Sequence, residues 1–421
     1  MSQATADTPH HTRRPLGALT TLCAEPAFAR LLLGSFISGA GNWFNTVALL
    51  GLTVRLTGSP LAVGITLALK TLPQLLLAPV AGVVADHLPR KRILIVADLL
   101  AALVTLSFLV ATSASRLWII YAGTLALVVV DTVRSPARNA ITPSIVAPDT
   151  LPAANALEGM ADGSVMLLGA ALGGLVSGMF GPTSAFLINS ASFLASAALI
   201  ATVRVPPIAA DSAARGVRAL TEVWPIVRAS RTLQLLLLLA TLWPIGGGAI
   251  NLLLTVYPTQ VFHAGDRGIG ALYAAIGVGF LLGGFVAPRF ARRTALSLTL
   301  AFIVEGILQI AVSQAPSLLI AVLALALATS AAGVGNACAS TIIMRASPAH
   351  ALGRVFALMG ALSTVTFTLS LLASGVLLHS MSPRTLGALA GGLITCAGLA
   401  ARVTSGSLLT QTETLPVSAA E

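Results

Sequence analysis

The sequence predicts an all-helical (all-α) membrane protein with twelve transmembrane helices in two pseudo-symmetric bundles of six. Charged residues make up only 9% of the 421 residues and hydrophobic residues make up 56%, whereas an average soluble domain is about 25% charged. Apolar runs recur along the chain, and a run of about 20 residues crosses about 30 Å of hydrocarbon as a helix. The two halves of the sequence also resemble each other on either side of a polar segment. Lipid is therefore the expected surrounding of most of the chain.

The expected helices are the apolar runs that Pro, Gly or charged residues bound. In chain order they cover 31–54, 60–85, 92–112, 116–134, 154–180, 183–203, 233–261, 269–290, 294–313, 317–345, 353–379 and 385–407. The connectors are short except for one polar, basic segment. The expected parts are therefore a tail (1–30), a first bundle (31–203), a cytoplasmic linker (204–232), a second bundle (233–407) and a second tail (408–421).

The basic residues predict how these helices are oriented. If the N-terminus is cytoplasmic, 19 of the 24 Lys and Arg residues fall on the cytoplasmic side, Arg134 and Arg138 among them, and four fall on the other side. Cytoplasmic loops of membrane proteins carry such an excess. Residues 1–30 lack a contiguous apolar stretch, so the first helix is expected to act as an uncleaved signal. We expect both termini in the cytoplasm and a monomer in the inner membrane of a bacterium.

Several function classes are unsupported by the sequence. The net charge of +10 is spread over short connectors, without the basic face and interleaved aromatic residues that nucleic-acid binding needs. Cys23, Cys338 and Cys396 are isolated, and neither CxxC nor HExxH occurs. No GKS or GKT follows the glycine-rich stretches, which are typical of close helix packing. We expect no enzyme activity, no metal and no cofactor.

A charged motif occurs once in each half. The stretch GVVADHLPRK (82–91) follows the second helix, and GFVAPRFARR (284–293) follows the eighth at an offset of 202. The first copy resembles the loop signature of the major facilitator superfamily, with Gly82, Asp86 and the Arg90-Lys91 pair in register. This resemblance implies parallel six-helix repeats related by an axis along the membrane normal.

Three further stretches are similar to one exporter branch of that superfamily, which includes macrolide-efflux proteins and the enterobactin exporter. They are the connectors 135–157 and 347–358 and the run GAALGG (169–174), which resembles an antiporter signature with Ala170 at the usual Pro. The resemblance implies a secondary transporter that exports small amphiphilic organic compounds by alternating access, coupled to protons as an antiporter. A siderophore exporter is the alternative, because a cation in mid-membrane suits an anionic chelator.

The motif after the second helix has a physical interpretation as a cytoplasmic latch. A carboxylate at Asp86 complements the partial positive charge of a helix N-terminus, and the resemblance implies helix 353–379 as the acceptor. Arg90 is expected to pair with Asp131 on the fourth helix. The alternative is a positive loop that only sets topology. The expected latch residues are Gly82, Asp86, Arg90, Lys91 and Asp131.

Ionisable residues inside membrane helices are functional candidates by default. Lys70 follows Pro60 by ten residues, about 15 Å along a helix, and Gln74 lies one turn further on the same face. We expect both to face a substrate cavity, or Lys70 to pair with a carboxylate. Uncharged candidates for the same cavity are Asn42, Trp43, Asn45, Asn251 and Asn336, each of which is also suited to a hydrogen bond between helices.

Carboxylates inside the helices are candidates for proton coupling. Glu158 and Asp162 lie one helical turn apart, and the repulsion between like charges favours uptake of a proton by one of them; Glu158 could instead be solvated at the helix start. Glu305, deep in the ninth helix, is suited to coupling or to an interhelical hydrogen bond. Asp98 is expected to bind basic residues of the 82–91 loop. The expected partners are a small-molecule substrate, protons and lipid.

Overall fold

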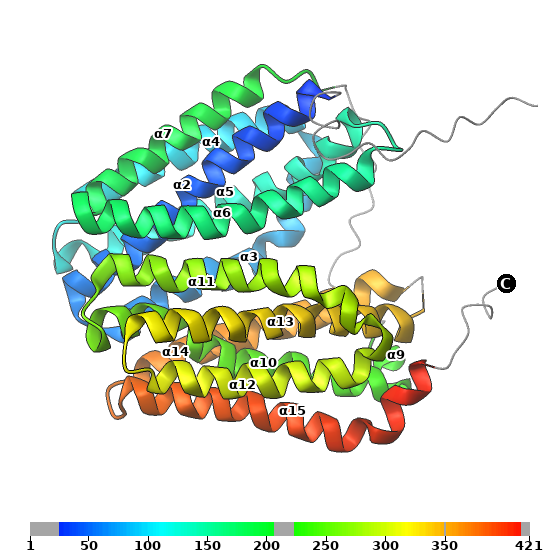
Figure 1. Cartoon of the computed structure of the whole chain (residues 1–421). Helices are drawn as coiled ribbons and strands as arrows, with labels where there is room; N and C mark the ends of the chain where they lie inside the picture. Colours follow the sequence, from blue (N-terminus) through cyan, green and yellow to red (C-terminus); the bar gives the residue numbers. More distant parts are fainter. Residues whose placement is uncertain (1–24, 206–222, 349–350, 414–421) are drawn as a thin grey trace, which may run out of the picture.

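The computed structural model describes residues 25–205, 223–348 and 351–413, and within these ranges the chain is helical and holds no strand (Figure 1). The first half consists of α2 (Pro26–Thr57), α3 (Pro60–His87), α4 (Arg90–Ser107), α5 (Leu117–Ile145), α6 (Leu151–Phe180) and α7 (Pro182–Ala201). The second half consists of the short α9 (Trp224–Ala229), then α10 (Arg231–Val256), α11 (Gly265–Val286), α12 (Thr294–Gln314), α13 (Leu318–Ala346), α14 (Leu352–Leu377) and α15 (Pro383–Glu413). Tight 3₁₀ turns, η1 (Phe108–Val110), η2 (Ala114–Arg116) and η4 (Ala287–Arg293), and the π-helical η3 (Tyr257–Val261) lie between them.

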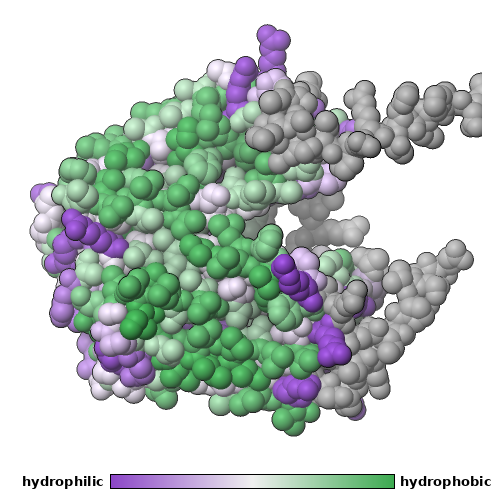
Figure 2. Space-filling view, viewed as in Figure 1, coloured by the Kyte–Doolittle hydropathy of each residue, from purple (hydrophilic) through white to green (hydrophobic). Residues whose placement is uncertain are grey.

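The long helices confirm the predicted all-helical membrane fold. Eleven of them are long and apolar enough to cross a membrane. The twelfth long helix, α2, has the required length but carries Asn42 and Asn45, which lower its hydropathy. Figure 2 shows apolar residues over the middle of the visible face, with polar residues gathered toward its left and right ends.

Local sequence signals explain where helices begin and end. Gly58 closes α2 in the left-handed region (φ 63°), and the Ser59 hydroxyl accepts a hydrogen bond from the backbone N–H of Ala62 at the start of α3. Serine is favoured before a helix because its hydroxyl accepts a hydrogen bond from an unpaired backbone N–H. Glycine is favoured after a helix because it adopts the left-handed conformation without steric cost.

The predicted end of the fourth helix is wrong. The expected helix stopped at 134, where basic residues begin, but α5 continues to Ile145 through Pro136 and Pro143. The reason is that Arg134 and Arg138 are part of α5 and bind neighbouring helices instead of lying in a connector. Arg134 therefore does not count as a loop charge.

The helices form two bundles that meet along two seams. Within the first bundle α2 packs on α6 and α7 and α4 packs on α5 and α7, whereas α12 packs on α13 and α15 within the second. The bundles touch mainly where α6 lies along α11 and where α3 lies along α14 (Figure 1).

Glycine allows the backbones at these seams to approach closely. A Cβ built on Gly270 of α11 would lie 2.5 Å from the carbonyl oxygen of Ala170 and 2.7 Å from the Cα of Gly174 on α6. At the other seam, a Cβ on Gly375 of α14 would lie 2.8 Å from the Cα of Leu61 on α3. Small residues at membrane-helix interfaces permit this kind of packing, so the glycine-rich stretches act as predicted.

The two ends of the molecule differ in how tightly the bundles are joined. We call the end where α2 begins and α7 finishes the terminal end (right in Figure 1) and the other the distal end. At the distal end one core cluster contains residues of both bundles, including Leu50, Leu67 and Leu252. At the terminal end each cluster belongs to one bundle, as for Ile141 in the first and Ile342 in the second. The bundles are therefore packed together distally and separated terminally.

The terminal separation is visible on the surface. Figure 2 shows a hollow between the two bundles at the right-hand end. Near that end of the α6–α11 seam, Met160 and Phe285 are 62% and 74% exposed.

Replacing Gly270 by alanine should weaken the distal seam. The new Cβ meets a carbonyl oxygen at 2.5 Å, and overpacking of this kind costs about 1–3 kcal/mol. Thermal unfolding of the purified protein in detergent should show a lower Tm for Gly270→Ala. Gly284→Ala on the same helix is the matched control, because nothing lies within 4 Å of its Cβ. Equal Tm values for the two variants would contradict the close seam.

Candidate functional site

The first bundle encloses a cavity of about 260 Å³. Its walls come from α2, α3, α4, α5 and α7, and no residue of the second bundle is among those that line it. Apolar side chains such as Leu127 and Phe193 share these walls with polar and charged ones. The cavity is therefore amphiphilic and belongs to one bundle.

The structure brings together most of the cavity residues expected from the sequence. Five of the seven candidates line this cavity, namely Asn42, Trp43, Asn45, Lys70 and Gln74. Asn251 on α10 and Asn336 on α13 lie in the second bundle and do not line it. Asp131 and Arg134 also line it, although the sequence analysis placed both near the cytoplasmic loops.

Lys70 is held against α2 by a hydroxyl group. Its Nζ donates to Thr46 Oγ1 at 2.7 Å, and the same hydroxyl donates to the Asn42 carbonyl at 2.8 Å. A threonine hydroxyl can accept and donate at once, so this short chain fixes where the ammonium group lies. No carboxylate within 4.0 Å pairs with Lys70 among the described residues.

Asp131 does not form the expected pair with Arg90. The Arg90 guanidinium donates instead to the Ala140 carbonyl at 3.1 Å. Asp131 precedes Ala140 by nine residues on α5, which places it about 14 Å deeper along the helix and beyond the reach of Arg90. The Asp131 side chain is exposed on the cavity wall.

A buried ion pair links three helices beside the cavity. Arg134 Nε lies 2.9 Å from Asp98 Oδ1, and Arg134 Nη2 donates to Ser38 Oγ at 3.0 Å. Asp98 is fully buried. The expectation that Asp98 would bind basic residues of the 82–91 loop is therefore wrong; its partner comes from α5 because the carboxylate points into the bundle.

Two buried polar atoms on the cavity wall have no partner among the described residues. They are Asn45 Oδ1 and Thr124 Oγ1, and their side chains belong to residues that are 4% and 2% exposed. Buried polar atoms are nearly always hydrogen-bonded. Within the part of the chain that the structure describes, these two atoms therefore lack the hydrogen bond that buried polar atoms normally make.

Trp43 connects the cavity with the second bundle. Its ring centroid lies 5.3 Å from that of Tyr273 on α11, with the planes tilted by 52°, a favourable aromatic arrangement. One side chain thus lines the cavity and contacts the opposing bundle.

None of the three proton-coupling candidates lines the cavity. Glu158 accepts a hydrogen bond from Thr142 at 2.7 Å. The Asp162 side chain is 68% exposed and lies 3.9 Å from Arg138. Glu305 is buried in the second bundle and accepts a hydrogen bond from Trp243 at 2.9 Å, so the interhelical bond expected for it is present.

The expected latch is only partly described. Gly82 and Asp86 lie outside the described residues as far as side-chain placement is concerned. Lys91 Nζ donates to the Ala201 carbonyl at 2.6 Å, at the end of α7. A cation near the C-terminus of a helix is favourable because the last carbonyls carry partial negative charge.

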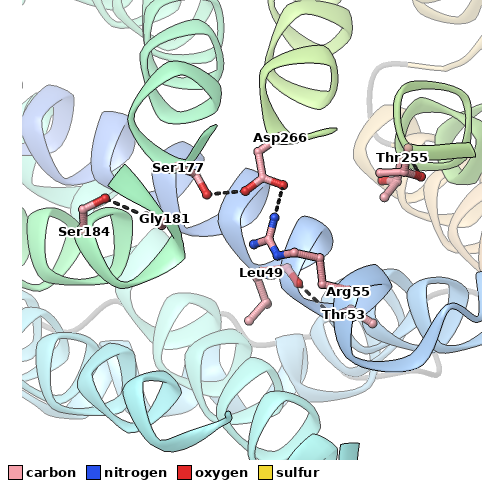
Figure 3. A network of polar contacts seen from close by, with 9 residues as sticks. Leu49, Thr53, Arg55, Ser177, Gly181, Ser184, Thr255 and Asp266 are labelled. Carbon is pink, nitrogen blue, oxygen red and sulfur yellow. Dashed lines mark hydrogen bonds and ion pairs between the residues drawn. The ribbon is translucent and has the colours of Figure 1, made fainter. Parts of the chain in front are cut away.

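An ion pair that the sequence analysis missed closes the distal end (Figure 3). Arg55 Nη1 at the end of α2 lies 2.7 Å from Asp266 Oδ1 in the first turn of α11, and the Ser177 hydroxyl of α6 donates to the other carboxylate oxygen. Asp266 is buried beside Gly51, where an added Cβ would collide with the carboxylate. The only signal in the sequence was that Arg55 and Asp266 sit at helix ends in opposite halves.

No group of three or more His, Cys, Asp or Glu residues that could hold a metal ion occurs in the described ranges.

Comparison with known proteins identifies relatives along most of the chain. The sequence profile of the Major Facilitator Superfamily matches residues 31–369. Multidrug efflux pump Tap of Mycolicibacterium fortuitum is 26% identical over 82% of this chain and 88% of its own length. Macrolide efflux protein A of Streptococcus pyogenes is 21% identical over 88% and 93%. The transporter YfiS of Bacillus subtilis is 29% identical, but that match spans only 40% of each chain.

Solved structures share the fold at low sequence identity. A bacterial homologue of the iron transporter ferroportin, in an inward-facing state, matches with a TM-score of 0.70 at 16% identity, over 93% of this chain and 99% of the other. The nucleoside transporter NupG matches with a TM-score of 0.67 at 15% identity, over 90% and 99%.

Breaking the buried pair should destabilise the first bundle. Asp98→Asn leaves Arg134 without its anionic partner, and loss of one member of a buried pair costs about 3–5 kcal/mol. Thermal unfolding in detergent should show a large fall in Tm. The double variant Asp98→Leu with Arg134→Met should regain much of it because no charge stays buried. Equal losses in the single and double variants would contradict this account.

Proposed function

The chain belongs to the Major Facilitator Superfamily, and on this premise we propose that it exports small amphiphilic organic compounds, drug-like or macrolide-like, from the bacterial cytoplasm. Membership makes it a multi-pass membrane transporter and not an enzyme. The efflux pumps among its relatives support export as the direction.

The observation that carries the proposal is the amphiphilic cavity. Aromatic and aliphatic walls such as Trp43 and Leu127 lie beside the charged groups of Lys70 and Asp131. Binding sites for small molecules are mostly apolar with a few placed polar groups that fix orientation. This composition suits an organic amphiphile better than a sugar.

Alternating access is supported by the contrast between the two ends. The Arg55–Asp266 pair and the distal core close one end, and the hollow opens at the other. With the termini in the cytoplasm, as the basic residues predict, this is an inward-facing state. In the outward-facing state the distal contacts would open, and the terminal latch formed by Asp86, Arg90 and Lys91 would close.

Proton antiport is the proposed energy source. A proton moving down 100 mV releases about 2.3 kcal/mol, which sustains a solute ratio of about fifty. Asp162 is exposed at the terminal half of α6 and Glu158 lies one turn before it. We assign proton exchange to this pair, because both face the half of the molecule that is open here.

A siderophore exporter is the second candidate. The observation that favours it is Lys70, whose only hydrogen bond among the described residues goes to a neutral hydroxyl. An ammonium group that has no ion pair within 4.0 Å to a residue that the structure describes would attract an anionic chelator.

Transport in inside-out vesicles tests the proposal. We expect accumulation of a labelled macrolide when the lumen is made acidic, and its collapse on addition of a protonophore. Asp162→Asn should abolish the dependence on the gradient, whereas Asp149→Asn, in an exposed connector, should not. Accumulation that persists in the presence of the protonophore would contradict proton coupling. Wild-type transport by Lys70→Ala would contradict the assignment of the cavity as the substrate site.

A reversible crosslink tests the motion. Thr71 Oγ1 on α3 and Thr368 Oγ1 on α14 are 2.9 Å apart across the seam. In a background with the three native cysteines replaced by serine, Thr71→Cys with Thr368→Cys should form a disulfide that stops transport until it is reduced. The control Thr105→Cys with Asn189→Cys joins α4 and α7 within one bundle and should leave transport intact. Undiminished transport by the oxidised α3–α14 variant would show that the bundles do not move at this seam.

A further inference from the structure

We propose that the cavity of the first bundle selects compact amphiphiles that carry an ammonium group and a carboxylate group together, with Asp131 receiving the ammonium and Lys70 the carboxylate. This inference rests on the proposed export function and deepens it by naming the substrate class.

Asp131 differs from the other acidic side chains that the structure describes within helices. The partnered ones are Asp98, Glu158, Asp162, Asp266 and Glu305. Asp131 has no hydrogen bond or ion pair with any described residue, and its side chain is exposed on the cavity wall. A carboxylate at this depth has no lipid or backbone group to bind, so a cationic group entering the cavity is its natural partner.

Lys70 presents the opposite charge on another wall of the same cavity. Its ammonium group is anchored to Thr46 Oγ1 at 2.7 Å, and a hydroxyl does not neutralise it. Asp131 attracts it electrostatically, yet the two groups are not within 4.0 Å of each other. The anchor holds the ammonium group against α2, more than 4.0 Å from the Asp131 carboxylate.

Arg134, the third charged group on the wall, is already satisfied. Asp98 and Ser38 bind its guanidinium at 2.9 and 3.0 Å. Among the described residues that line it, the cavity therefore offers one cation, on α3, and one anion, on α5, neither of which has an ion pair within 4.0 Å. A ligand with a single charge would bind only one of them, whereas a ligand with both charges can form a charge-assisted contact with each.

Size and the remaining walls refine the substrate class. A cavity of about 260 Å³ lies just below the usual range for drug-sized ligands of about 300–1,000 Å³, so it fits a compact molecule or one end of a larger one. Trp43 and Phe193 supply flat apolar surface for a ring between the two charges.

Three compounds with one skeleton test the inference. Para-(aminomethyl)benzoic acid carries both charges, its methyl ester carries only the ammonium, and its N-acetyl derivative carries only the carboxylate. We would measure binding to the purified protein by calorimetry and uptake into inside-out vesicles. Thermal unfolding would confirm that each variant is folded.

Substitutions of the two charged residues should weaken the binding of different compounds. Loss of one charge-assisted contact should weaken binding about ten- to hundredfold. Asp131→Asn should therefore weaken the acid and the ester but not the N-acetyl compound, and Lys70→Gln should weaken the acid and the N-acetyl compound but not the ester. Asp131→Glu should restore binding of the acid and the ester because it keeps a carboxylate, and Asp149→Asn should change the binding of none of the three compounds.

The outcomes separate this inference from the proposed function. Equal effects of Asp131→Asn on all three compounds, or no effect on any, would overturn the assignment of the ammonium site. Export of a macrolide without binding of any of the three compounds would overturn the inference and leave the exporter intact. Charge-selective binding in a protein that transports nothing under a gradient would support the cavity assignment and reject the exporter.

Discussion

The absence of hydrogen-bonding partners in hydrocarbon governs this structure. Every polar group inside the membrane must be satisfied by the protein itself or by what it encloses. Most of the described charges obey this rule through direct contacts, as Arg134 does with Asp98 and Glu305 does with Trp243. Lys70 and Asp131 line one cavity and form no ion pair within 4.0 Å among the described residues. For this reason we propose the substrate site at these two residues.

The same molecule must hold its bundles together and still let them separate. The distal end meets the first need with backbone contacts at glycine and with the Arg55–Asp266 pair. The terminal end lacks a core shared by both bundles among the described residues. Trp43 lines the cavity and also contacts Tyr273 of the second bundle across the seam. Binding and bundle packing therefore share one side chain.

Apolar run length and helix-end signals were sufficient to predict the helices, their order and the grouping into two bundles, because lipid imposes a hydropathy pattern that single residues rarely disturb. The end of α5 was not predictable that way, since a buried Arg134 looks like a loop residue until its partner Asp98 is known. At the site, depth along a helix was enough to place Lys70 in the cavity. Asp131 was misplaced because α5 continues to Ile145, which puts Asp131 about 14 Å deeper than the Ala140 carbonyl that Arg90 binds. Asn251 and Asn336 do not line the cavity of the first bundle and stay predictions.

The polarity of α2 has a consequence for biogenesis. This helix is the least able of the twelve to reside alone in lipid, since Asn42 and Asn45 interrupt its apolar surface, and it packs chiefly on α6 and α7. Those partners begin 94 and 125 residues after α2 ends at Thr57 (151 − 57 and 182 − 57). We therefore expect α2 to remain beside the insertion machinery until α7 has emerged from the ribosome, which makes assembly of the first bundle a late event in translation.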